Sequence, residues 1–245
     1  MADEPPGPLI WSLPEPPGRP TTHLSRADIL RAAVTIADTD GARALTMRRV
    51  AQAVGASTPM SLYRYVGSKD GLVDLMIDAV YAEIPLTEPP SGGGGWRAGL
   101  ERLALDSWTV IQRHLWFGEL IHTRPPFGPN ALRFFDFRFG LLEKLGLSAD
   151  DLSLLTGAVD GHLFGAALQL AEERRMRTRS GLHTDDQLAD AAKPVLEPIL
   201  ADDRYPAFAR WYRGRTGSGP ADPVVWTLGC LLDGITSRLG LDSAV

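Results

Sequence analysis

The sequence predicts an all-α protein built from a small N-terminal domain and a larger C-terminal domain. Apolar residues recur at helical spacing along most of the chain, and no segment shows the strict alternation of a half-buried strand. The segment after Pro85 is rich in Pro, Ser and Gly, a composition typical of a flexible linker. We therefore divide the chain into an arm at 1–24, a domain at 25–84, a linker at 85–95 and a second domain at 96–245.

The composition is that of an ordinary globular protein. Of the 245 residues, 44% are apolar and 22% are charged, so the chain can bury a sizeable core. The single cysteine, Cys230, excludes an intramolecular disulfide and a cysteine-zinc cluster, and we expect it to be buried on the last helix. No apolar run approaches the roughly 20 residues that span a bilayer, and the acidic, proline-rich N-terminus differs from a signal peptide. These features predict a cytoplasmic protein without a membrane partner.

The N-terminal arm and the first domain differ in pattern. Residues 1–24 carry seven prolines and no helical periodicity, which predicts a disordered or extended arm, with or without a function. The domain after it holds four helices. Ser25 and Asp28 form a capping box at the start of the first helix, while Thr46 and Ser68 cap the second and the fourth. The four helices are expected near 25–40, 46–54, 59–65 and 68–84.

The second domain is predicted to hold five longer helices. Ser148 and Asp151 form a capping box at the start of the third of them. These helices are expected near 96–116, 129–146, 149–176, 185–201 and 222–240, with shorter turns at 118–122 and 204–213.

The two short helices at 46–54 and 59–65, joined by a tight turn, have the pattern of a helix-turn-helix. The second helix of such a motif can enter the major groove of DNA. Residues 24–71 contain seven basic and four acidic side chains, a net charge of +3 within a chain whose total is −5. A locally basic surface suits contact with DNA phosphates. One small head makes few base contacts, so we expect a homodimer on palindromic double-stranded DNA.

Three stretches resemble the DNA-binding head of the tetracycline-repressor (TetR) family. They are Gly41-Ala-Arg-Ala-Leu-Thr-Met-Arg-Arg-Val-Ala, Val54-Gly55, and Ser61-Leu-Tyr-Arg-Tyr-Val-Gly-Ser-Lys-Asp-Gly-Leu72, within a match over 25–84. The C-terminal part resembles the family's regulatory domain at Trp96-Arg97, at Thr123-Arg124-Pro125 and around Gly165. The resemblance implies an N-terminal three-helix helix-turn-helix domain and a larger helical domain that binds a ligand and dimerises. It implies a repressor that a small hydrophobic effector releases from its operator. An activator, or a protein of the same fold without an effector, is the alternative.

The resemblance also implies which residues contact DNA. Thr46 would cap its helix and face a phosphate, Lys69 would bind a phosphate at a helix N-terminus, and the residues around Met60 would lie nearest the bases. The full set is Thr46, Arg48, Thr58, Pro59, Met60, Tyr63, Arg64, Tyr65 and Lys69. Gly55 and Tyr63 are eight positions apart, one more than is usual in the family, so the turn carries one extra residue and the base-reading positions are assigned only to within one residue.

Several residues of this domain have a structural alternative. Tyr63 and Tyr65 are either phosphate contacts or half-buried aromatics. Arg43 and Arg49 are expected in salt bridges or in solvent rather than on DNA. The residues assigned to the core are Leu45, Val50, Leu62 and Val66.

Two helices of the second domain are predicted to form the dimer interface. Glycines at steps of four fall on one face of the 149–176 helix, and because glycine costs helix stability, a row of three suggests close approach of another helix or a ligand. A leucine-rich stripe runs along the 222–240 helix. The predicted interface residues are Gly157, Gly161, Gly165, Leu228, Leu232, Ile235 and Leu239. The alternative is packing within one chain.

The middle of the second domain is rich in aromatic residues, which favours a pocket for an apolar or aromatic effector. Candidate lining residues are Leu103, Trp108, His122, Phe127, Phe134, Asp136, Phe137, His162 and Gln169. In tetracycline repressors a histidine and a glutamate help to hold the magnesium–drug chelate. The resemblance places those positions at Leu120 and about Gln169, which suit a hard cation poorly. We therefore expect no metal, no cofactor and no tetracycline binding, unless a loop shift lets His122 act as a ligand.

No pattern points to an enzyme. The chain lacks a P-loop, a Gly-x-Ser-x-Gly motif and His/Cys spacing for a catalytic metal, and no nucleophile stands beside a base. The sequence therefore predicts a ligand-responsive DNA-binding regulator without catalytic residues.

Overall fold

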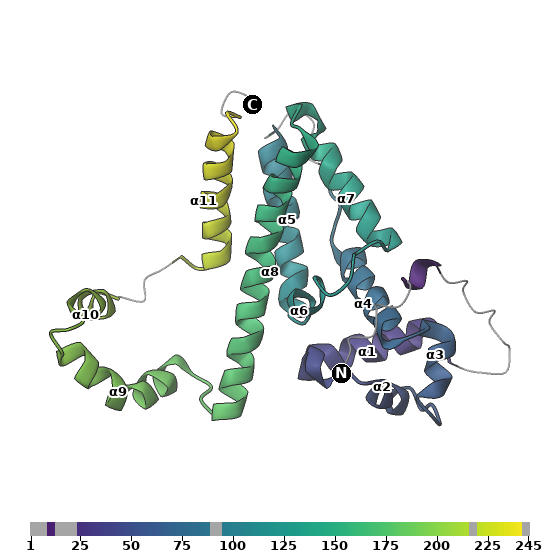
Figure 1. The fold of residues 1–245 in the computed structure, drawn as a ribbon, viewed down its shortest axis with the longest axis horizontal. Coiled ribbons are helices and arrows are strands. Elements are labelled where there is room, and N and C mark those ends of the chain that lie inside the picture. The colour runs from purple at the N-terminus through teal and green to yellow at the C-terminus, as the bar shows by residue number, and fades with distance from the viewer. Residues whose placement is uncertain (1–8, 13–23, 89–94, 216–219, 242–245) are drawn as a thin grey trace, which may run out of the picture.

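The computed structural model describes residues 9–12, 24–88, 95–215 and 220–241, and over these ranges it contains helices and no strand (Figure 1). The predicted all-α class is confirmed. The N-terminal domain, here called the head, contains α1 (Arg26–Asp40), α2 (Met47–Ala53), α3 (Met60–Val66) and α4 (Lys69–Glu83). The C-terminal domain, here called the body, contains α5 (Gly95–Arg113), α6 (Phe117–Leu120), α7 (Pro129–Leu142), α8 (Ala149–Ser180), α9 (Asp185–Ala201), α10 (Pro206–Arg213) and α11 (Pro223–Arg238). Short 3₁₀ turns lie at Ile10–Ser12, Ala42–Ala44 and Glu143–Leu145.

The head helices begin where the sequence predicts. The Ser25 hydroxyl accepts a hydrogen bond from the Asp28 N–H, and the Asp28 carboxylate accepts one from the Ser25 N–H, so the capping box is present. Thr46 and Ser68 cap α2 and α4, each accepting from the N–H three residues ahead. The predicted core residues are confirmed: Leu45 is 2% exposed, and Val50, Leu62 and Val66 are fully buried.

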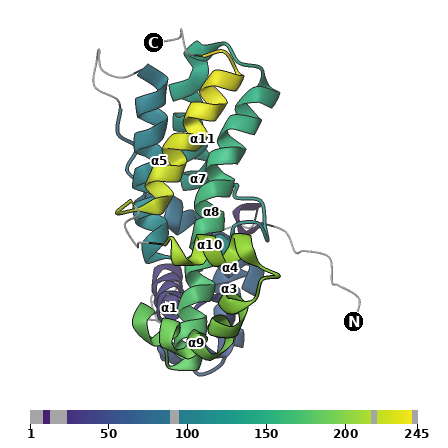
Figure 2. The same ribbon diagram turned by 90° about the vertical axis from the view of Figure 1, so that its left-hand side faces the viewer.

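The long helix α8 is the axis of the body. Helices α5, α6 and α11 pack along it, and α7 packs on α5 (Figures 1 and 2). Helix α4 belongs to the head in sequence, yet it packs against α6 and α7 as well as α1. Helix α4 therefore packs against both domains and connects them.

Two elements differ from the sequence prediction in extent. Helix α8 continues to Ser180 because Glu and Arg pairs such as Glu173–Arg177 support the extra turn, and Gly181 with φ of 69° ends it. The two segments predicted as short turns form helices, namely α6 and α10.

Helices α9 and α10 extend away from the bundle, on the opposite side of α8 from the head (Figure 1). No residue of α9 is buried, and in α10 Ala209 is the buried one. This pair leaves apolar side chains exposed, among them Val195, Tyr205, Phe208 and Trp211.

Part of the predicted N-terminal arm is packed against the fold. Ile10 is 3% exposed, and its N–H donates to Oδ2 of the buried Asp74 on α4 at 3.0 Å. The arm prediction for residues 1–8 and 13–23 lies outside the described residues, as does most of the predicted linker.

Within the described ranges, no helix combines the length and apolar character needed to cross a bilayer.

Candidate DNA-binding surface and effector-binding body

The helix-turn-helix is built from α2, the turn at Val54–Pro59, and α3. Gly55 has φ of 67°, a conformation that suits glycine, and the Ala56 N–H bonds back to the Ala51 carbonyl, so the chain reverses tightly after α2. Val50 and Leu62 face inward, which fixes α3 against α2 and α1. The opposite face of α3 is thereby held outward.

Most of the predicted DNA-contact residues are exposed on the head. Arg48 and Lys69 have no partner in the described part of the chain, so both charges are available to phosphates. Met60, at the start of α3, is 72% exposed, which is unusual for an apolar side chain. The exposed members are Thr46, Arg48, Thr58, Met60, Arg64 and Lys69, and the half-buried ones are Pro59, Tyr63 and Tyr65.

The arginines and tyrosines of the head differ in their contacts: some contact one another, and others form salt bridges. The guanidinium of Arg64 lies 4.9 Å from the ring centroid of Tyr65 and donates to its hydroxyl at 2.7 Å. Tyr63 and Tyr65 pack partly against the head core, which fits both roles considered for them. The salt bridges expected for Arg43 and Arg49 are confirmed: Arg43 pairs with Glu172 and Arg49 with Asp40.

Five rings from α4, α6, α7 and α8 form an aromatic cluster between the head helix α4 and the body. Tyr81, Phe117, Phe134, Phe135 and Phe164 are linked by ring-centroid distances of 5.1 to 5.8 Å, and His122 lies edge-on to Phe164 at 5.6 Å. Two of the predicted effector residues, Phe134 and His122, are in it. Burial raises the pKa of Tyr81, so its phenol stays protonated. Tyr81 is not among the predicted effector residues because it lies on α4, outside the predicted second domain.

An arginine–aspartate pair borders the aromatic cluster. Arg138 is 5% exposed, and its Nη1 donates to Oδ1 of Asp160 at 2.7 Å. Its guanidinium lies 5.2, 5.3 and 5.7 Å from the ring centroids of Phe134, Phe135 and Phe139. Burial raises the pKa of Asp160, and the charge of Arg138 opposes that rise. The Arg138 Nε is buried without a hydrogen-bond partner, which is costly for a charged donor.

The remaining predicted effector residues are dispersed. The Trp108 Nε1 donates to Asp222 Oδ2 at 3.1 Å, and His162 Nε2 is 2.9 Å from the Val224 carbonyl, so both side chains hold the start of α11. Leu103 is buried on α5 and Phe137 is half-buried on α7. The exposed members are Phe127, Asp136 and Gln169.

The loop after α6 carries the positions relevant to a tetracycline–magnesium site. Leu120 is half-buried at the end of α6, and the Thr123 hydroxyl donates to the Leu120 carbonyl at 2.6 Å. His122 packs edge-on against the Phe164 ring. In the part of the chain that the structure describes, no three His, Cys, Asp or Glu side chains gather closely enough to hold a metal ion.

Both domains match known families. Residues 29–76 match the family described as bacterial regulatory proteins, tetR family, and residues 88–239 match the tetracyclin repressor-like, C-terminal domain. This chain belongs to the TetR family. It is therefore a DNA-binding transcriptional regulator rather than an enzyme, and as a TetR regulator it binds operator DNA as a homodimer and responds to a small molecule.

Relatives support this assignment along the chain. The HTH-type transcriptional repressor DrrR1 of Streptomyces coeruleorubidus is 39% identical over 82% of this chain and 74% of its own length. An HTH-type transcriptional regulator of Saccharopolyspora erythraea is 33% identical over 89% of this chain and 84% of its own. The crystal structure of the Streptomyces coelicolor TetR family protein ActR in complex with actinorhodin aligns with a TM-score of 0.68, covering 89% of this chain and 100% of that chain at 23% identity, which shows a shared fold.

Part of the predicted dimer interface of this TetR regulator is buried by packing within one chain. Leu228 and Leu232 are 1% and 0% exposed, because they hold α11 onto α8 and α5 of the same chain. The alternative of intrachain packing therefore applies to these two residues. Ile235 and Leu239 are half-buried and line a groove of about 400 Å³ between α8 and α11. Cys230, expected to be buried, is exposed because it points away from the side of α11 that carries Leu228 and Leu232.

The glycine row of α8 faces outward. Gly157, Gly161 and Gly165 are exposed, and a Cβ added at any of them would meet nothing within 4 Å in the described chain. Leu154, on the same helix, is 71% exposed. An exposed strip of glycine and leucine lets a second helix approach closely.

Three aspartates at steps of four along α4 connect the head to the body. Asp74 receives two hydrogen bonds from the buried Arg124 of the Thr-Arg-Pro motif, at 2.5 and 3.1 Å, and Asp70 lies 3.4 Å from the same guanidinium. Asp78 accepts from the backbone N–H groups of Asn130 and Ala131, each at 2.9 Å, and so caps α7. These contacts tie α7 and the α6–α7 loop to α4.

A second junction lies at the other end of α4. His114, at the end of α5, has Nδ1 2.7 Å from Asp38 Oδ1 and Nε2 3.2 Å from Glu83 Oε1. Both ring nitrogens are satisfied only when both carry a proton. Burial opposes that charge, but the hydrogen bonds and charges of Asp38 and Glu83 outweigh burial and raise the pKa of His114. Trp116 Nε1 also donates to Asp38 Oδ1, at 2.6 Å.

Proposed function

We propose that this TetR regulator is a repressor that leaves a palindromic operator when a largely apolar, aromatic effector binds in the body. The relative with 39% identity is named a transcriptional repressor, and ActR was crystallised with actinorhodin bound. A regulator that binds operator DNA works where that DNA lies, which supports a cytoplasmic protein. Effector binding favours a body conformation in which the two heads of the dimer no longer match the operator.

The DNA-binding roles follow from exposure and charge. Arg48 and Lys69, both exposed and without internal partners, bind phosphates, and Lys69 does so at the N-terminus of α4, where the helix dipole adds to its charge. Thr58, Pro59 and Met60 begin the recognition helix and lie nearest the bases. Thr46, Tyr63, Arg64 and Tyr65 complete the phosphate contacts.

The observation that carries the effector proposal is the unsatisfied Nε–H of Arg138 beside the aromatic cluster. A buried charged donor without a partner is costly, and an acceptor on a bound molecule would remove that cost. The surrounding rings of Phe134 and Phe135 favour an aromatic skeleton. Leu120 cannot ligate magnesium and the Thr123 hydroxyl is engaged by the backbone, so tetracycline is not the effector.

Operator selection tests the DNA-binding part of the proposal. The full chain is used to select duplexes from a random pool, and affinity is then measured by fluorescence anisotropy. We expect a palindrome, and we expect Lys69→Ala to weaken binding to all sequences alike and to reduce the salt slope by about one. Selection of a non-palindromic site, or a Lys69→Ala variant with unchanged binding and slope, contradicts the assignment.

Release from that operator tests the effector part. A panel of uncharged aromatic compounds is titrated against the complex, beside tetracycline with magnesium. We expect release by aromatic compounds and none by tetracycline–magnesium. Arg138→Lys, which keeps the charge beside Asp160 but has no Nε–H, should retain operator affinity and need about 10-fold more effector. The control is Arg133→Lys, an exposed arginine on the same helix. Release by tetracycline–magnesium, or an unchanged effector response in Arg138→Lys, refutes the proposal.

A further inference from the structure

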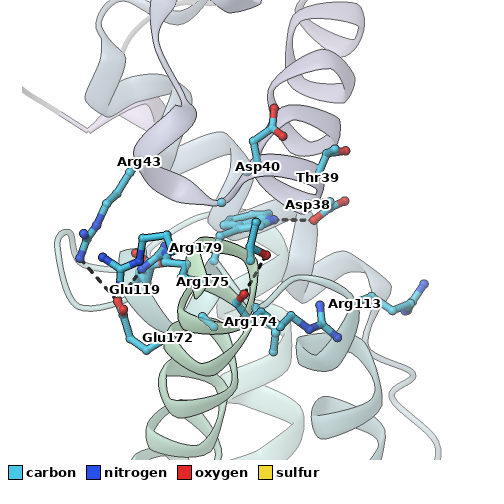
Figure 3. A pocket seen from close by; sticks show the side chains of 16 residues that line it. Asp38, Thr39, Asp40, Arg43, Arg113, Glu119, Glu172, Arg174, Arg175 and Arg179 are labelled. Carbon is cyan, nitrogen blue, oxygen red and sulfur yellow. Dashed lines mark hydrogen bonds and ion pairs between the residues drawn. The ribbon is translucent and has the colours of Figure 1, made fainter. Parts of the chain in front are cut away.

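A cavity of about 380 Å³ lies at the junction of head and body (Figure 3). Its walls come from the end of α1 and the turn after it in the head, and from α5, α6, the α5–α6 turn and the last turns of α8 in the body. Its volume lies in the range of small-molecule sites. None of the residues predicted to bind the effector lines it, and neither does any ring of the aromatic cluster. The cavity is therefore a separate space.

The cavity has an apolar floor. Trp116 is 2% exposed and presents its indole there, and Leu115 and Ala171 are each 7% exposed beside it. The only polar atom of the indole, Nε1, is already bonded to Asp38. A flat apolar skeleton would fit such a floor.

The acidic side chains around the cavity are all paired, whereas some of the basic ones are not paired within the described residues. Every carboxylate among the lining residues has a cationic partner within the chain. Asp38 meets His114, Asp40 meets Arg49, Glu119 meets Arg175, and Glu172 meets both Arg43 and Arg175. Among the lining arginines, Arg113 pairs with Glu83. The acidic groups therefore offer no free charge to a ligand.

Two lining arginines of α8 are left over. Arg174 and Arg179 are exposed and have no partner among the residues that the structure describes. Figure 3 shows them on the same helix as Arg175, which reaches the head: a Cβ at Gly41 would lie 3.2 Å from Arg175 Nη2. The uncompensated charge of the cavity is therefore positive.

We propose that this junction cavity binds a small organic anion, a carboxylate on a flat apolar skeleton, with the unpaired charges of Arg174 and Arg179 attracting the carboxylate and Trp116 supporting the skeleton. A ligand there contacts the head and the body at once, so it stabilises one relative position of the two. Its effect on the operator rests on the proposed function, whereas its binding does not. The alternative is that the arginines merely suit the negative C-terminal end of α8 and bind nothing.

Calorimetry with naphthoate and its uncharged counterpart naphthamide tests the binding. We expect saturable binding of naphthoate, one per chain, with a Kd of about 1 mM or tighter, and binding of naphthamide about 10-fold weaker. The double variant Arg174→Gln/Arg179→Gln should lose about 10-fold in naphthoate affinity, because charge-assisted hydrogen bonds are lost. Arg133→Gln, an exposed arginine on α7, is the matched control and should bind as wild type.

A second variant reports on the cavity itself. Thr178 is exposed and lines the cavity, so Thr178→Trp should fill it without disturbing the core and should abolish naphthoate binding. No saturable naphthoate binding, equal binding of naphthamide, or full binding by the double arginine variant overturns the proposal in favour of the helix-end explanation.

The link to DNA is measured separately. Saturating naphthoate should change the operator Kd several-fold, and operator should change the naphthoate Kd by the same factor. Naphthoate binding without any change in operator affinity overturns the regulatory part alone. A chain that binds naphthoate but selects no operator contradicts the proposed function and leaves the cavity assignment standing.

Discussion

At the residue scale, His114 is the side chain on which three helices converge. Its imidazole bridges Asp38 of α1 and Glu83 of α4, while Arg113, beside it on α5, also pairs with Glu83 at 3.0 Å. The head and the body therefore share one charged group. Its protonation affects how firmly they are joined.

We expect His114 to stabilise the fold in a pH-dependent way. Its pKa is higher in the folded protein than the ordinary value of 6.5, so its contribution is complete below pH 6.5 and is lost as the pH rises through the folded pKa. The free energy of unfolding of His114→Phe should therefore fall furthest below wild type under mildly acidic conditions, by about 1.4 kcal/mol for each unit of pKa elevation. Denaturant unfolding at fixed protein concentration, from pH 5 to 9 (about two units either side of neutrality), measures this.

The control for His114→Phe is His183→Gln, at an exposed histidine. It should follow the wild-type pH profile. A difference between His114→Phe and wild type that is constant across the pH range, or that grows as the pH rises, contradicts the charged bridge.

At the element scale, α4 acts as the connection between the domains because its polar residues are committed to the body. Asp74 binds Arg124 and the Ile10 N–H, and Asp78 caps α7. The fit is close at Gly128, where an added Cβ would lie 2.1 Å from Asp78 Oδ1. Only glycine allows α7 to begin so near the carboxylate.

We expect Asp78→Ala to destabilise the protein by about 1–3 kcal/mol, because it leaves two N–H groups at the start of α7 unsatisfied. Thermal and denaturant unfolding measure the change. Asp136→Ala, at an exposed acidic residue of α7, is the matched control and should stay within about 0.5 kcal/mol of wild type. Equal stabilities of the two variants would show that the cap is unimportant.

At the scale of the whole molecule, we propose that the outer face of α8 and the groove beside α11 contact the second chain of the dimer. The glycine row is open, and Leu154 and Trp226 are 71% and 60% exposed. Burying such a patch is a favourable source of association energy. The dimer then sets the spacing of the two recognition helices on a palindrome.

We predict that Leu154→Glu and Leu231→Glu, at the rim of this groove, each produce monomers, because each would bury an unpaired charge in the interface at a cost of several kcal/mol. Sedimentation velocity at low micromolar concentration measures the state. Leu132→Glu, at an apolar residue of α7 that is 50% exposed, should remain dimeric. Leu232→Glu cannot serve as the test, since Leu232 is buried in its own chain and its loss would unfold the monomer. If both groove variants remain dimeric, the interface lies on another surface of the protein.

Local patterns made the head predictable. The capping residues Ser25, Thr46 and Ser68, and the buried positions Val50 and Leu62, depend on contacts within a few turns of chain. The effector residues were harder to predict, because an aromatic-rich stretch does not show which rings will meet. Of the nine named, His122 and Phe134 joined the aromatic cluster, while Trp108 and His162 anchor α11.

The sequence by itself determined the helical class, the helix-turn-helix and its exposed basic residues, since periodicity, caps and charge are local properties. Tertiary structure alone decided the groups that combine distant segments. Arg138 meets Asp160, Arg124 meets Asp74, and Arg175 of α8 approaches Gly41 across the domain junction. The spacing of these residues in the sequence does not predict that they meet. Their proximity depends on which helices pack together, and several helices carry similar apolar stripes. The buried charges, the unsatisfied donor of Arg138 and the junction cavity all arise from that choice.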